Sequence, residues 1–243
     1  MIKIDKTGIV VPAILSAAGI TETNLNSTAY TAGKRKFTIK KTIYGHLITV
    51  KDTLVKLQKD KCCFCERKVS AGEPGHIEHY RPKGGYKKDD KSKLVKPGYY
   101  WLAYNFENLF FSCNRCNTSY KKNYFPLADE RKRVTNHTGN ILNEDPLIIS
   151  PADEPNPHLI FDNEFIKPNN KSRKGKETIK RTGLNRKPLA EDRLLFLKPL
   201  KILAKVARGI GPESQEARDL FIELGKSKSP FSFMVVCNFP DLV

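Results

Sequence analysis

Two pairs of cysteines in this sequence have the spacing of metal ligands. One pair is Cys62 and Cys65 and the other is Cys113 and Cys116, each with two residues between its members. Paired thiolates on two turns can complete one tetrahedral zinc site. Because cysteine fills all four positions, no coordination site is left for a substrate, and the sequence predicts a structural Zn²⁺ ion.

Four polar residues between and beside these pairs could do chemistry: Glu78, His79, Asn108 and Asn117. A histidine can take a proton from water near neutral pH, and carboxylate and amide oxygens bind hard cations. Taken alone, the adjacent Glu78 and His79 are more simply an ordinary surface pair. Adjacent residues on a strand face opposite sides, so Glu78 and His79 can both reach one phosphate only if the backbone bends. Pro82, just downstream, is consistent with such a bend.

The composition favours a polyanionic partner. The chain has 243 residues with 43 Lys and Arg against 26 Asp and Glu, a net charge of +17. This excess favours nucleic acid, because each neutralised phosphate releases counterions, although a basic face for an acidic protein would also explain it. No apolar run reaches the ~20 residues of a membrane helix, and the first residues show no signal-peptide pattern. We therefore expect a cytoplasmic protein with reduced thiols, in which paired cysteines bind metal.

Residues 38–57 carry a helical pattern that leads into the first cysteine pair. Apolar residues recur there at steps of three or four, at Ile43, Leu47, Val50, Leu54 and Leu57. Residues 1–37 show no clear period. We expect three parts: an N-terminal segment over 1–37, a zinc-bearing core with its leading helix over 38–130, and a mostly helical C-terminal region over 131–243.

The sequence of the C-terminal region predicts a pair of strands followed by helices. The strands are expected near 147–149 and 159–161, and helices over 178–183, 189–197, 200–207 and 213–224. Pro199 should kink or stop the long helix, because proline has no N–H to donate. The expected fold class is α+β, a predominantly helical frame around a small zinc-stabilised core.

The order of these motifs resembles the zinc-bearing form of the HNH nuclease family. That family has Asp/Glu-His at a strand end, then Asn-Leu, then Cys-x-x-Cys followed by His or Asn, and this chain has asparagine in the last position. Its fold, the ββα-metal or His-Me finger, is two strands and a helix around one catalytic ion. Longer stretches look like the PtuB-type HNH proteins of Septu and some retron anti-phage systems, among them 62–66, 77–83, 100–104, 125–127 and 183–186.

The resemblance implies a role for each polar residue. His79 takes a proton from the attacking water, and Glu78 and Asn117 hold one divalent cation, Mg²⁺ or Mn²⁺. Asn108 fixes His79 by hydrogen bonding and braces its loop. The lysine-rich loop over 83–96 is either solvated or contacts phosphate. Candidate phosphate contacts are Arg81, Lys83 and Lys121.

The resemblance also implies an activity and a partner. We expect a metal-dependent endonuclease that hydrolyses phosphodiester bonds in DNA and works beside PtuA, an ATPase of the ABC/SMC type. The C-terminal region either binds this partner or covers the core. An effector that cuts RNA or tRNA at the same site is one alternative. Another is a zinc-stabilised binding or adaptor module without catalysis.

Overall fold

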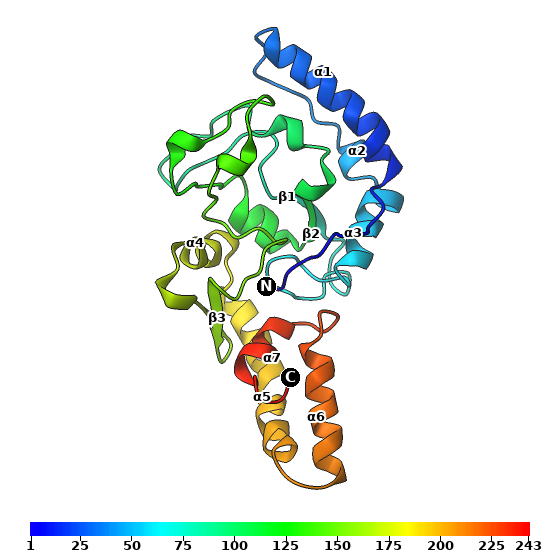
Figure 1. Ribbon diagram of the computed structural model, residues 1–243, viewed down its shortest axis with the longest axis vertical. Coiled ribbons are helices and arrows are strands. Elements are labelled where there is room, and N and C mark those ends of the chain that lie inside the picture. Colours follow the sequence, from blue (N-terminus) through cyan, green and yellow to red (C-terminus); the bar gives the residue numbers. More distant parts are fainter.

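The computed structural model describes residues 1–243 and shows small sheets within a mostly helical molecule (Figure 1). The α-helices are α1 Ile20–Thr31, α2 Lys41–Tyr44, α3 Asp52–Leu57, α4 Arg173–Thr182, α5 Lys187–Ala207, α6 Pro212–Gly225 and α7 Ser232–Asn238. The strands are β1 His76–His79, β2 Leu109–Ser112, β3 Leu159–Asp162 and β4 Phe165–Pro168. The α+β class is confirmed. None of the helices combines the length and apolar character that crossing a membrane requires.

The first sheet brings the two halves of the motif region together. β1 and β2 run antiparallel, with Glu78 opposite Phe110 and His79 opposite Leu109. All four residues of β2 are buried. Shortly after β2 the chain enters a π-helical segment, Arg115–Lys121, which carries Cys116, the last of the four paired cysteines. The chain thus supplies two strands and a helical segment in succession, and the identity of this unit as an HNH core stays a prediction.

The helix expected over 38–57 is interrupted. It breaks after α2 at Gly45, and helical structure resumes at Leu47 as a π-helical turn that leads into α3. Val50 and Leu54 are buried as predicted, but Leu47 is 64% exposed. The prediction of one continuous helix was wrong because glycine weakens a helix interior, and Leu47 faces solvent at the break.

The strand pair expected near 147–149 and 159–161 is not formed. β3 pairs instead with the following strand, β4. Residues 147–149 are buried without belonging to a strand, and Ile149 donates its N–H to the Thr178 hydroxyl of α4 at 2.8 Å. The apolar run therefore indicated burial correctly, but a short apolar run does not distinguish strand from irregular structure.

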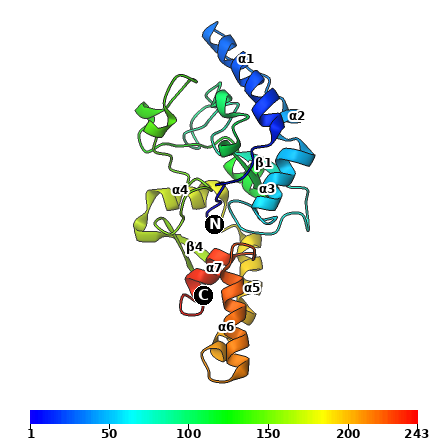
Figure 2. The same ribbon diagram turned by 45° about the vertical axis from the view of Figure 1, so that its right-hand side comes forward.

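α5 continues through Pro199, so the prediction that the helix stops there was wrong, and the predicted kink stays a prediction. Pro199 is exposed, and the carbonyl of Leu195, which loses its helical partner, can bind water on this exposed side. The helices expected over 200–207 and 213–224 lie within α5 and α6. Figure 1 and Figure 2 both show α5 and α6 as a hairpin that extends away from the first sheet.

One continuous cluster of 44 buried hydrophobic residues runs from Met1 to Leu242. It includes residues from all three expected parts of the chain. α1 has no buried residue, which explains why its sequence shows no apolar period. The division of the chain into three parts stays a prediction, and the buried cluster crosses each of its boundaries.

Candidate metal centre and active site

The four paired cysteines meet at one point. Their sulfur atoms lie within 4.8 Å of one another and all four side chains are buried. Cys65 Sγ and Cys113 Sγ are 3.9 Å apart, close to the ~3.8 Å edge of a tetrahedron with Zn–S bonds of ~2.3 Å. Burial raises the pKa of the Cys62 thiol, and a bound cation would stabilise its thiolate. The residues fit a zinc ion.

Arg186 brings positive charge to this cage from the C-terminal half of the chain. It lies in the turn between α4 and α5, and its guanidinium nitrogens approach the sulfur atoms of Cys116 at 3.4 Å, Cys65 at 3.8 Å and Cys113 at 3.9 Å. Four thiolates around Zn²⁺ carry net negative charge, which such donors offset. Sequence reasoning assigned Arg186 no role, because nothing beside it marks a contact with distant cysteines.

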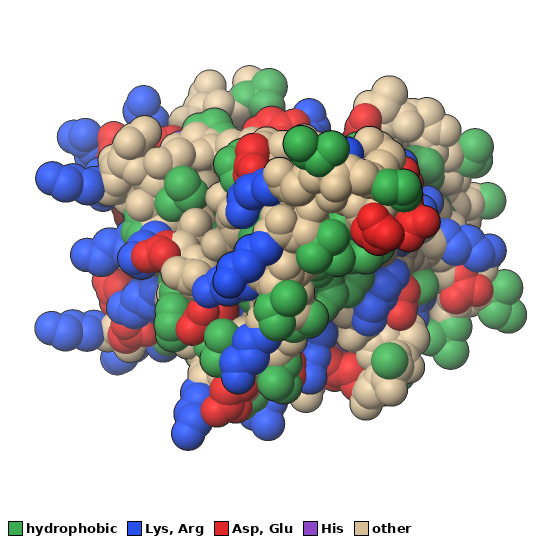
Figure 3. Space-filling view, turned by 90° about the horizontal axis from the view of Figure 1, so that it is seen from below, with side chains coloured by type: hydrophobic (Ala, Val, Ile, Leu, Met, Phe, Trp, Pro, Cys, Tyr) green, Lys and Arg blue, Asp and Glu red, His purple; other side chains and the backbone are tan.

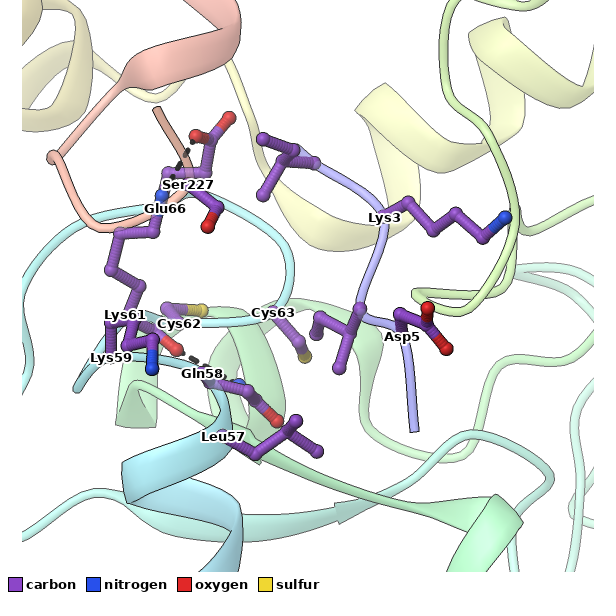
Figure 4. Close-up of a pocket in the computed structure, with 12 residues that line it drawn as sticks. Lys3, Asp5, Leu57, Gln58, Lys59, Lys61, Cys62, Cys63, Glu66 and Ser227 are labelled. Carbon is purple, nitrogen blue, oxygen red and sulfur yellow. Dashed lines mark hydrogen bonds and ion pairs between the residues drawn. The ribbon is translucent and has the colours of Figure 1, made fainter. Parts of the chain in front are cut away.

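The first cysteine pair is anchored to β2 by contacts that imitate a strand. Gln58, just after α3, accepts the Phe111 N–H and donates to the Phe111 carbonyl, both at 2.7 Å. The Cys63 N–H donates to the same carbonyl at 2.9 Å. Figure 4 shows Gln58, Cys62 and Cys63 with Lys61 around a small cavity of about 170 Å³. Gln58 thus occupies the edge of β2 that a third strand would use.

His79 ends β1 with its ring held in one orientation. Its Nε2 lies 2.9 Å from the Ala103 carbonyl oxygen. A carbonyl oxygen only accepts hydrogen bonds, so Nε2 carries the proton, and the lone pair of Nδ1 accepts from the Lys83 ammonium. Lys83 Nζ lies 3.4 Å from Nδ1, and the Tyr44 ring packs edge-on against the imidazole at 4.7 Å between centroids.

The surroundings of His79 keep its imidazole neutral. Burial lowers the pKa of His79 well below its usual range, and the ammonium groups of Lys83 and Lys121 lower it further. The contact with Ala103 acts in the opposite direction. At neutral pH the ring is therefore unprotonated, which is the form that accepts a proton from water.

Asn108 braces the loops around His79 and does not contact the imidazole. Its Oδ1 accepts the Arg81 N–H at 2.7 Å, and its Nδ2 donates to the carbonyl oxygens of Arg81 at 3.0 Å and Leu102 at 3.1 Å. Leu102 directly precedes Ala103, whose carbonyl orients His79. The expected direct hydrogen bond to His79 is absent, and Asn108 acts on the ring through the backbone.

Glu78 is buried beside Lys121, which is itself fully buried. Lys121 Nζ lies 2.5 Å from Glu78 Oε1 and donates to the His79 carbonyl at 3.0 Å. The Lys121 ammonium is the one partner of Oε1, which no other donor reaches. Burial raises the pKa of Glu78, and the ammonium of Lys121 opposes this. With both contacts inside the protein, Lys121 does not reach a surface where phosphate could lie.

Glu78, His79 and Asn117 line one open cleft of about 360 Å³. Glu78 and His79 are both paired with β2, and both border the cleft although they are neighbours on one strand. Asn117 Nδ2 faces the Ile77 carbonyl at 3.5 Å, which leaves its amide oxygen without a protein partner. The structure thus brings three of the four predicted residues to one cleft and places Asn108 behind it.

Three lysines also line this cleft: Lys83, Lys96 and Lys122. Among the predicted phosphate contacts, Lys83 has this position, whereas Arg81 pairs with the buried Glu144 at 3.1 Å. Lys96 and Lys122 were not singled out from the sequence. The lysine-rich loop signalled Lys96 as one of several, but Lys122 comes to the cleft through the helical segment before it.

Comparisons with known proteins agree with the motif order. No protein-family model matches the chain. The chain is 38% identical over 156 residues to the Septu protein PtuB of Bacillus mycoides (strain KBAB4). The aligned residues make up 63% of this chain and 52% of PtuB. The resemblance to PtuB-type HNH proteins is confirmed. A retron Vc95 protein of Vibrio cholerae serotype O1 biovar El Tor, provisionally named an HNH endonuclease, is 28% identical over 186 residues, which are 74% of this chain and 77% of that protein.

A third similarity is to another Septu protein. The chain is 28% identical over 134 residues to the Septu protein PtuA of the same Bacillus strain, and these residues are 55% of this chain but 18% of PtuA. This match is a likeness between two sequences and is not evidence that the proteins touch. The chain spans about half the length of the Bacillus PtuB that it matches.

Proposed function

We propose that this chain is a metal-dependent HNH endonuclease that hydrolyses phosphodiester bonds in DNA. The observation that carries the proposal is the state of His79. Its ring is buried, neutral and fixed by Ala103, and its unprotonated Nδ1 contacts Lys83, which lines the same cleft. A general base for water needs this combination of a fixed ring and an unprotonated nitrogen, and the attacking water takes the position at Nδ1 that Lys83 occupies in the structure.

The residues of the cleft divide the reaction between them. His79 Nδ1 takes a proton from water as the water oxygen attacks phosphorus and the bond to the leaving oxygen breaks. Lys83, Lys96 and Lys122 attract the phosphate by charge. Asn108 keeps His79 in place through the Leu102–Ala103 backbone. None of these steps requires the buried cysteines, which would hold the structural zinc ion.

Glu78 and Asn117 would hold the catalytic cation, Mg²⁺ or Mn²⁺. Glu78 Oε1 is buried with the Lys121 ammonium as its one partner and the amide oxygen of Asn117 is free, and hard cations prefer such oxygen donors. A cation bound there would neutralise part of the negative charge that develops on the phosphate in the transition state. Lys121 competes for Glu78, so we expect weak cation binding in the absence of nucleic acid.

The substrate and its alternatives rest on charge and on resemblance. The net charge of +17 supports nucleic acid without distinguishing DNA from RNA. DNA is proposed from the resemblance to HNH nucleases. An effector that cuts RNA or tRNA would use the same groups, and a zinc-stabilised adaptor would use the basic surface without His79.

We further infer that the chain is the nuclease effector of an anti-phage defence system and acts with a PtuA-like ATPase of the ABC/SMC type. Support comes from the names of the similar proteins, since PtuB and PtuA are both called Septu proteins and another relative is named for a retron. The residues of this chain do not identify the partner independently.

The test compares two histidines of the same strand. Purified wild-type, His79→Ala and His76→Ala proteins are incubated with DNA and RNA of one sequence, with Mg²⁺, Mn²⁺ or chelator, and with or without a PtuA-like protein. We expect His79→Ala to lose about 10²- to 10⁴-fold in cleavage rate, the usual contribution of a general base. Zinc content and circular dichroism should be unchanged, and His76→Ala should cleave like the wild type.

The outcomes separate the candidate functions. If His79→Ala cleaves as fast as the wild type, His79 is not the general base. Cleavage of RNA without cleavage of DNA selects the RNA-cutting alternative. Nucleic-acid binding without cleavage under every condition, equal in His79→Ala and wild type, selects the adaptor module.

A further inference from the structure

The outer side of α5 carries an apolar stripe that no other part of the molecule covers. Leu195 and Ile202 are 67% and 68% exposed, and Val206 is 42% exposed. Pro199, also exposed, lies between them. Steps of four, three and four residues place these four side chains in one line along the helix. At 1.5 Å per residue the stripe is about 17 Å long.

This stripe is separate from the face with which α5 joins the core. Leu197, Leu200 and Ala204 are buried, and α5 packs against α6. A surface helix usually needs one apolar face to attach it to its own protein. A second face left in water exposes apolar area without serving the fold, and such contiguous exposure typically marks an interaction site.

A row of lysines follows the stripe. Lys198, Lys201 and Lys205 are exposed and lie three or four residues apart. Lys201 donates to the Asn163 amide oxygen at 2.6 Å, whereas no acidic side chain pairs with any of the three. Figure 3 views the molecule from the hairpin end and shows hydrophobic side chains interspersed with lysine and arginine side chains on that face.

The acidic residues of α5 do not neutralise this row. Asp192 pairs with Arg67 at 2.9 Å, and Glu191 lies 4.0 Å from Lys187 near the start of the helix. Positive charge along one edge of an apolar stripe therefore stays available to a partner. The complement of this surface is an apolar line with negative charge beside it.

We propose that the outer face of α5 binds an amphipathic helix of a partner protein, with apolar residues along its centre and acidic residues along one edge. A helix laid along α5 can cover the four apolar side chains at three- and four-residue steps. Its acidic edge meets Lys198, Lys201 and Lys205. This inference does not depend on the proposed nuclease activity, because no residue of the cleft belongs to the face.

Charge and composition disfavour two other occupants. A second copy of the chain would bring another net charge of +17 against the same row of lysines. A nucleic-acid backbone would use the lysines but would leave the apolar stripe in water. The acidic helix is the occupant that uses both features.

The test uses two synthetic peptides of about 20 residues, long enough to form several helical turns. Both carry leucine at three- and four-residue steps; one has glutamates beside the leucines and the other has lysines. Binding to the full-length protein is measured by fluorescence anisotropy for wild type, Ile202→Glu, and Ile48→Glu as the control. Ile48 is 79% exposed outside α5, so both variants add one charge at a solvent-exposed isoleucine.

We expect the acidic peptide to bind the wild type. Its affinity for Ile202→Glu should be at least about tenfold lower, which is the usual effect of losing a residue at the centre of an interface. Ile48→Glu should bind like the wild type. The double variant Lys198→Glu, Lys205→Glu should bind the acidic peptide more weakly and the basic peptide more tightly than the wild type does. Equal binding of the two peptides, or equal binding by Ile202→Glu and wild type, overturns the proposal. So does a dimer by light scattering that Ile202→Glu abolishes, or displacement of the peptide by duplex DNA.

Discussion

His79 depends on its neighbours for the protonation state that the proposed reaction needs. A base whose pKa is lowered stays unprotonated to lower pH, so cleavage should persist below pH ~6.5, the usual pKa of histidine. Burial has the largest effect and cannot be removed without unfolding the site. Lys83 can be changed on its own, because it acts through its charge at 3.4 Å from Nδ1.

We predict that Lys83→Met moves the acidic limb of the cleavage profile to higher pH. Loss of the ammonium removes one cause of the lowered pKa of His79, so the ring becomes protonated at a higher pH than in the wild type. The measurement is single-turnover cleavage against pH. Lys122→Met is the matched control, since Lys122 lines the cleft but is not among the charges that lower the pKa of His79.

The two variants separate a slower rate from a shifted profile. Both remove a cleft charge, so both can lower the rate by weakening phosphate binding. If the acidic midpoint stays fixed in Lys83→Met, or moves equally in Lys122→Met, the proposed coupling between Lys83 and His79 is wrong.

At the scale of elements, the turn between α4 and α5 supports the zinc site through Arg186. We predict that Arg186→Ala lowers zinc affinity about 10- to 100-fold, the usual effect of losing a residue that supports metal ligands. The zinc affinity of Arg186→Lys should lie between those of Arg186→Ala and the wild type, because lysine keeps the positive charge but lacks the planar guanidinium group. Arg131→Ala is the control, since the Arg131 side chain is 91% exposed.

Zinc affinity is measured by competition with a chromophoric chelator, which needs no cleavage assay. Arg186→Ala and Arg131→Ala with equal affinities would show that the guanidinium merely lies near the thiolates. Tyr120 packs near Arg186, so circular dichroism should accompany the titration to separate zinc loss from misfolding.

Local chemistry could be predicted from the sequence, whereas contacts between distant elements could not. The Cys-x-x-Cys spacing is local, and the structure places those four sulfur atoms together. Lys121 and Arg186 obtain their contacts from β1 and from the cysteine cage, neither of which their own flanks reveal. Pro199 misled for a related reason, because whether proline breaks a helix depends on which side faces solvent.

At the scale of the molecule, the core around the zinc site continues into the C-terminal helices. Glu66, just after the first cysteine pair, is buried and accepts from Ser232 of α7 at 2.8 Å. Lys61 Nζ lies 3.3 Å from the same carboxylate oxygen. The buried hydrophobic cluster also includes residues of both regions. Loss of the metal should therefore affect the whole chain.

We predict that zinc removal, or Cys113→Ser, unfolds the zinc core and the helical hairpin together. Structural zinc contributes an apparent ~10–16 kcal/mol in small zinc domains, comparable with the ~5–15 kcal/mol stability of a typical domain. Trp101, the single tryptophan, reports on the core, and far-ultraviolet circular dichroism reports on the helices.

The two signals should change at the same chelator concentration. Helical signal that survives after tryptophan fluorescence has changed would show that the hairpin folds independently of the zinc site. Addition of zinc to the chelated protein should restore both signals, which distinguishes metal loss from damage by the chelator.

Gln58 has a consequence for how this protein behaves at high concentration. A two-stranded sheet normally presents free edges on which strands of other molecules can add, and such edges promote aggregation. Along β2, β1 occupies one edge, and Gln58 and Cys63 occupy the N–H and carbonyl of Phe111 on the other. Gln58 and Cys63, together with Lys6 at the Leu109 carbonyl, thus protect β2 from intermolecular strand pairing where many copies gather.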